Sequence, residues 1–67
     1  MNLALLLCVL NSGQNIIISL DRPDGSSIDL YEGTVAVARE SFPGVHYDVV
    51  YISVNQSRKM VNILVKE

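Results

Sequence analysis

Basic side chains are scarce in this 67-residue chain. It has five Lys and Arg against seven Asp and Glu, so its formal net charge is −2. Arg58 and Lys59 are the only two basic residues that are adjacent. Binding to a phosphate backbone relies on clustered Lys and Arg that displace counterions. The composition therefore argues against nucleic acid as a partner and leaves Arg58 and Lys59 as the candidate contacts if one exists.

Cysteine and histidine are equally rare, with one of each. Cys8 can form no internal disulfide, and its place in an apolar run predicts a buried, inert thiol. His46 and Asp48 share one face of an extended segment, but a metal site needs three or four ligands. Ser41, His46 and Asp48 supply the residue types of a catalytic triad, but the sequence has no nucleophile elbow. We therefore expect no metal, no cofactor, no catalytic residue and no enzymatic activity.

Long apolar runs are also missing. The longest stretch, residues 3–10, has eight residues, whereas a membrane-spanning helix needs about 20. No Lys or Arg precedes the run, and residues 11–13 (Asn-Ser-Gly) do not resemble a signal-peptide cleavage site. Its apolar residues occupy both odd and even positions, as in a strand that is covered on both faces. The run is predicted to be a buried strand of a cytoplasmic protein, with a processed segment as the open alternative.

The residues that are present predict a single domain over 1–67, because 49% of them are hydrophobic and the chain is short. Its strongest local signal is residues 22–25, Arg-Pro-Asp-Gly, typical of a type I turn closed by a bulged glycine. The turn and the apolar alternation around it predict a hairpin that pairs Leu20 with Ile28 and Ile18 with Leu30.

Residues 34–42 follow, and they are predicted to form a short helix. Val35, Ala38 and Phe42 share one helical face, and Pro43 disfavours a helical backbone at the residue before it. The segment also contains two valines and alternates in the manner of a strand. Helix and strand both remain open for residues 34–42, and the helix is favoured.

Two further strands are predicted at residues 45–55 and 60–65, joined by a polar connection. Three apolar residues on each would share one face: Val50, Ile52 and Val54 on the first, and Val61, Ile63 and Val65 on the second. The resulting fold class is α+β, a small two-layer β-β-β-α-β-β domain. One short helix packs on a largely antiparallel sheet whose strand order cannot be derived.

The opposite face of these strands carries Tyr47, Val49 and Tyr51, joined by Met60 and Leu64. One helix can cover only one side of a sheet, so these five residues are candidates for a protein interface, where Tyr and Met are enriched. The alternative is that the N-terminal run covers them, or that the sheet curls into a small barrel.

The leading functional hypothesis is a non-enzymatic protein-binding module, an inhibitor or adaptor. In size and mild acidity alone, the chain is similar to small phage-encoded inhibitors that bind host proteins. A homodimer is expected, because small domains often gain burial by oligomerising. The alternative is a nucleic-acid-binding module that reads through a sheet face. In it, Tyr47 and Tyr51 would stack on bases, and Arg58 and Lys59 would contact phosphates.

Overall fold

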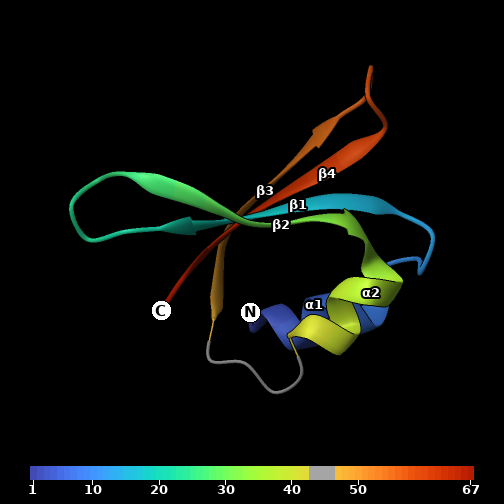
Figure 1. Ribbon diagram of the computed structural model, residues 1–67, viewed down its shortest axis with the longest axis horizontal. Coiled ribbons are helices and arrows are strands. Elements are labelled where there is room, and N and C mark those ends of the chain that lie inside the picture. The colour runs from blue at the N-terminus through green and yellow to red at the C-terminus, as the bar shows by residue number, and fades with distance from the viewer. Residues whose placement is uncertain (43–46) are drawn as a thin grey trace.

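Four strands form one sheet, and two helices lie on one of its faces (Figure 1). The structure, a computed structural model, describes residues 1–42 and 47–67. Its elements are α1 (Leu3–Val9), β1 (Asn15–Asp21), β2 (Ser27–Thr34), α2 (Val35–Ser41), β3 (Asp48–Asn55) and β4 (Met60–Lys66). The two-layer α+β class is confirmed, with a second helix in place of the expected first strand.

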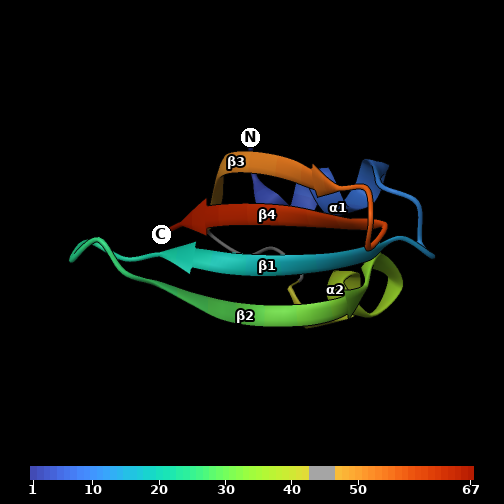
Figure 2. The same cartoon turned by 90° about the horizontal axis from the view of Figure 1, so that it is seen from above.

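The sheet has the order β2-β1-β4-β3, which makes it mixed (Figure 2). Each outer strand is antiparallel to its inner neighbour, but β1 and β4 run parallel in the middle, with Ile16 opposite Val61 and Ile18 opposite Ile63. The expected antiparallel arrangement therefore holds for two of the three pairs. The parallel pair arises because β4, the return strand of the second hairpin, inserts beside β1.

The hydrophobic core lies between the sheet and the helices. The central strands supply its upper layer, and each helix supplies the residues that face the sheet. Its fully or almost fully buried members are Leu3, Leu6, Leu7, Ile16, Ile18, Val35, Ala38, Ile63 and Val65. The predicted helix over residues 34–42 is confirmed as α2, and Val35 and Ala38 are the residues that it buries.

The expectation of a buried strand at residues 3–10 is wrong, because this run forms α1. Leu and Ala lack the branched β-carbon that favours strands and are good helix formers. The side chain of Asn2 accepts a hydrogen bond of 2.7 Å from the N–H of Ala4 and so caps the first turn. The sheet then receives one face of the helix, and Cys8 is left exposed rather than buried as expected.

The first hairpin confirms the predicted turn. The N–H of Gly25 donates to the carbonyl of Arg22 at 3.0 Å, and the N–H of Arg22 donates to the carbonyl of Ser26 at 2.9 Å. Gly25 has a φ of 88°, which is accessible to glycine at little cost. The hydroxyl and the N–H of Ser26 both donate to Asp24, and they lower the pKa of its carboxyl below the ordinary value.

The register of this hairpin is confirmed near the turn and wrong further out. Leu20 pairs with Ile28 as predicted, but Ile18 pairs with Tyr31 instead of Leu30. A bulge in β2 supplies the extra residue at this point. The shift brings the ring of Tyr31 into the core layer, where it meets Phe42 edge to face at 6.1 Å.

Arg39 joins the two helices. Its guanidinium donates to the carbonyls of Leu7 and Leu10, each at 2.6 Å, and to the hydroxyl of Ser12 at 2.7 Å. These carbonyls belong to the last turn and the C-cap of α1, where backbone acceptors lack partners within the helix and a positive charge is favourable. The arginine of α2 therefore fixes the end of α1 and the loop that follows it.

Candidate functional site

Exposed apolar side chains gather on one side of the molecule. Among the described residues, nine large apolar side chains are exposed, and seven of them belong to Met1, α1 or β3. Figure 2 shows that α1 lies beneath the β3–β4 half of the sheet, whereas α2 lies beneath the β1–β2 half. We call this surface the α1–β3 side and define it as Met1, Leu5, Val9, Val50, Tyr51, Ile52 and Val54.

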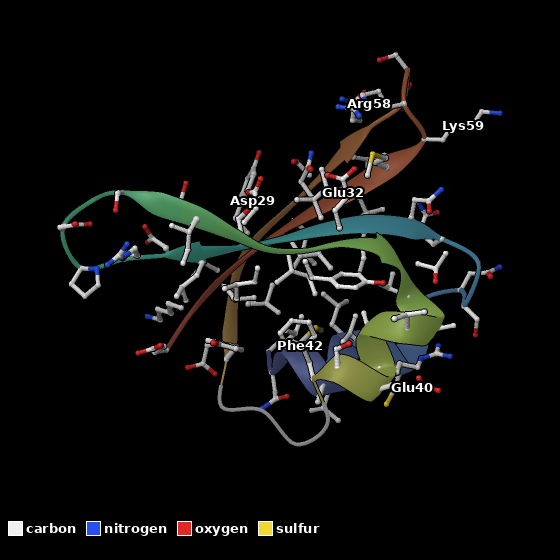
Figure 3. All side chains as sticks on the ribbon, in the orientation of Figure 1. Asp29, Glu32, Glu40, Phe42, Arg58 and Lys59 are labelled. Carbon is white, nitrogen blue, oxygen red and sulfur yellow. The ribbon has the colours of Figure 1, made fainter. Side chains whose placement is uncertain are left out.

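The α1–β3 side carries almost no charge. No Asp, Glu, Lys or Arg occurs before Asp21, and Asp48 is the only charged side chain in β3. The opposite edge of the sheet differs, because Asp29 and Glu32 project from β2 on the face without helices (Figure 3). Removing charges from water costs free energy. The α1–β3 side is therefore the surface that a protein partner could cover with the smallest desolvation cost.

The outer edge of β3 is covered only at its beginning. Asn2 forms an antiparallel bridge with Asp48, in which the N–H of Leu3 donates to the carbonyl of Tyr47 at 3.0 Å. The N–H of Val49 donates to the carbonyl of Met1 at 2.7 Å. From residue 50 to residue 55, no described part of the chain lies beside this edge. Such an edge presents backbone donors and acceptors to any strand that can approach.

A bulge at Val50 determines which side chains of β3 face the helices. Val49 pairs with Val65 and Tyr51 with Leu64, so Val50 has no partner in β4. Beyond it, Ile52 and Val54 pair with core-facing residues of β4 and lie on the helix face. They remain 44% and 63% exposed because this end of β3 rises away from the helices (Figure 1). The strand is therefore apolar toward both faces.

The bulge also divides the five interface residues predicted from the sequence. Tyr51 and Leu64 pair on the face without helices, and Met60 shares that face but is only 8% exposed. Tyr47 and Val49 instead pack against the core, and the ring of Tyr47 meets Phe42 edge to face at 6.4 Å. The expected patch is thus not one continuous surface, and the exposed valines and isoleucine of β3 were not among the candidates.

The two candidate nucleic-acid contacts lie in the turn between β3 and β4. Arg58 and Lys59 are exposed there, at the end of the sheet far from the helices (Figure 3). The N–H of Arg58 donates to the side chain of Asn55 at 3.2 Å, which shapes the turn. Since Tyr47 is packed beside Phe42, the two tyrosines do not form a joint stacking platform near these cations.

The described residues contain no cluster of three or more side chains suited to hold a metal ion. His46 lies outside the described residues. The structure therefore does not describe the predicted His46–Asp48 pair or the grouping of Ser41, His46 and Asp48. A surface pocket of about 560 Å³ lies between the first hairpin and the end of β4. Leu20 and Ile28 line it together with charges of both signs, including Arg22. Its mixed lining points to no particular ligand.

Comparison with known proteins gives no relative. No protein-family model matches the chain, and no curated protein or solved structure matches it. No helix in residues 1–42 or 47–67 has the length and apolar character needed to cross a bilayer. The functional proposal therefore depends on the geometry of the α1–β3 side.

Proposed function

We propose that this chain is a non-enzymatic protein-binding module, an inhibitor or adaptor, that receives an extended segment of its partner at the edge of β3. The observation that supports this proposal is the uncharged apolar edge from residue 50 to residue 55. In strand addition, main-chain hydrogen bonds supply affinity, and the alternating side chains on both faces supply specificity.

The side chains of β3 suit this mode of binding. On the helix face, Ile52 and Val54 stand at alternate positions and would pack against the partner's side chains. On the other face, Tyr51 is 61% exposed beside Leu64 and offers an aromatic ring of the kind that dominates protein interfaces. The covered start of the edge, at Asp48, limits how far the incoming strand can extend.

The nucleic-acid alternative has less support. Its sheet-face platform needed Tyr47 and Tyr51 together, and only Tyr51 lies on the exposed face. Two cations in one turn are few for a phosphate-binding surface. Titration against a labelled single-stranded oligonucleotide at low and high salt would revive the alternative if binding were tight and salt-sensitive.

The experiment that tests strand addition compares two isoleucines in opposite edge strands. Ile52 in β3 is 44% exposed and Ile28 in β2 is 43% exposed, and both lie on the helix face. Wild type, Ile52→Lys and Ile28→Lys would each serve as bait for proteins of the native host. A partner that is retained by wild type and Ile28→Lys should be lost from Ile52→Lys, because the buried lysine charge would be unpaired.

The captured partner would then be purified and titrated against all three chains. We expect Ile52→Lys to weaken its binding at least about tenfold, which corresponds to about 1.4 kcal/mol. Equal binding to wild type and Ile52→Lys would contradict the proposed role of the β3 edge, and so would equal weakening by both lysine variants.

A further inference from the structure

We propose that a second copy of this chain occupies the β3 edge. The two β3 strands would pair antiparallel about a twofold axis at Ser53 and join two sheets into one. This inference rests on the proposed function, because it names the occupant of the same edge. It also assigns Ile52, Ser53 and Val54 as the centre of the interface.

The register follows from the pattern of side chains. Directly opposed residues of antiparallel strands point to the same face of the sheet. A twofold pairing must therefore place each residue of β3 opposite a residue of the second copy that points to the same face. The bridge at Asp48 leaves residues 50–55 for pairing. With Ser53 opposite its own copy, Ile52 of each chain lies opposite the partner's Val54. Four exposed apolar side chains then meet on the helix face.

Charge favours a second copy at this edge over the edge of β2. Residues 50–55 of β3 carry no charged side chain, so a twofold pairing at Ser53 places no like charges opposite one another. A twofold pairing of β2 strands would instead bring together Asp29 and Glu32 from both copies, and like charges oppose it.

The helices give a second, independent reason. Leu5 and Val9 are exposed at 65% and 76% and stand four residues apart, so they form one outward stripe on α1. Because α1 lies beneath the β3–β4 half of the sheet, the twofold axis at β3 turns the two α1 helices toward each other beneath the joined sheet (Figure 2). One symmetry operation thus brings together both the β3 edges and the α1 helices of the two copies, and closed twofold dimers are the commonest assemblies.

Sedimentation equilibrium on the purified chains tests the proposal. Wild type should reach twice its monomer mass of 7.4 kDa, as should Ile28→Lys, whereas Ile52→Lys should stay monomeric with an unchanged circular dichroism spectrum. A wild type that is monomeric up to its solubility limit would overturn the second copy as occupant. If an Ile52-dependent partner were captured nonetheless, the proposed function would stand without the dimer. A dimer that Ile28→Lys and Ile52→Lys disrupt equally would overturn the β3 pairing.

Disulfide trapping tests the register even if Ile52→Lys does not fold. In a Cys8→Ser background, Ser53→Cys should form a linked dimer under mild oxidation, because opposed residues lie about 4.5–5.5 Å apart and a disulfide spans that separation. Ser27→Cys in the same background, at the exposed edge of β2, is the matched control and should not be linked. A dimeric wild type in which Ser53→Cys fails to link, or links no more than Ser27→Cys, would overturn the pairing at Ser53.

Discussion

At the scale of single residues, Arg39 is the side chain with the widest structural influence. It lies on α2, yet three of its hydrogen bonds reach α1 and the loop after it. Hydrogen bonds that involve a charged group contribute more to stability than neutral ones, typically about 1.5–3 kcal/mol. The guanidinium also satisfies carbonyls that would otherwise lack a partner at the end of a short helix.

We expect Arg39→Leu to lower the free energy of unfolding by about 2–3 kcal/mol, because the carbonyls of Leu7 and Leu10 lose their donor. Arg39→Lys should recover only part of this loss, since an ammonium lacks the planar set of donors. Urea unfolding followed by circular dichroism gives the values. Arg58→Leu, in an exposed turn, is the control and should change the midpoint little. Equal midpoints for Arg39→Leu and wild type would contradict the capping role.

Gly25 is the residue that sets the first turn. Its φ of 88° resists a branched side chain, so Gly25→Val should cost about 1–2 kcal/mol. Gly13→Val is the matched control, because Gly13 is not in the left-handed region and an added Cβ would have its nearest contact at 3.7 Å. Thermal melting of both variants tests the comparison, and a Gly25→Val chain that melts with wild type would show that the turn tolerates an L-residue.

At the scale of elements, α1 shows where reasoning from sequence stopped. Every residue from 3 to 10 is apolar, so the run has no polar positions to reveal a period of two or 3.6. The first hairpin was predictable because turn chemistry and alternation agree around Gly25. Neither turn chemistry nor alternation marks a bulge. The bulge at Val50, which puts Val49 and Tyr51 on opposite faces of the sheet, was therefore visible only in the structure. Of the predicted interface residues, Tyr51 and Leu64 are neighbours on the face without helices, whereas Tyr47 and Val49 pack against the core.

Adjacent leucines in α1 provide a direct test of its orientation. Leu6 is 6% exposed in the core, whereas Leu5 is 65% exposed on the outer face. Leu6→Ala should therefore destabilise the chain by about 2–4 kcal/mol, and Leu5→Ala by less than about 0.5 kcal/mol. Urea unfolding at low protein concentration keeps self-association from contributing. Similar losses for the two variants would contradict the one-sided packing of α1.

At the scale of the whole molecule, stability and binding surface are separated across the sheet. The inner strands β1 and β4 have a strand on each side and contribute four of the fully or almost fully buried core residues. Asp29 and Glu32 project from the outer strand β2, whereas exposed apolar side chains concentrate in α1 and the outer strand β3. The two edge strands thus differ in the surface that they present, charged at β2 and apolar at β3.

Hydrogen exchange should resolve this division. Amides of β1 and β4 should exchange slowest, through global unfolding, because both strands are paired on each side. Amides of residues 50–55 should exchange faster in dilute solution and slow down as the protein concentration rises, since a second copy would cover them. Exchange measured by NMR at several concentrations tests both statements. Slowest exchange in β2 or β3 would contradict the assignment of β1 and β4 as the most stable part.

The central place of β4 has a consequence for biosynthesis. β4 separates β1 from β3 in the sheet, but the ribosome produces it after both of them. Until β4 leaves the exit tunnel, the nascent chain can close only its first hairpin, and β3 has no strand to pair with. The edge of β1 that β4 will pair with stays open for the same interval. Folding is therefore expected to be completed late in synthesis, in one step, when residues 60–66 insert between two strands that already exist.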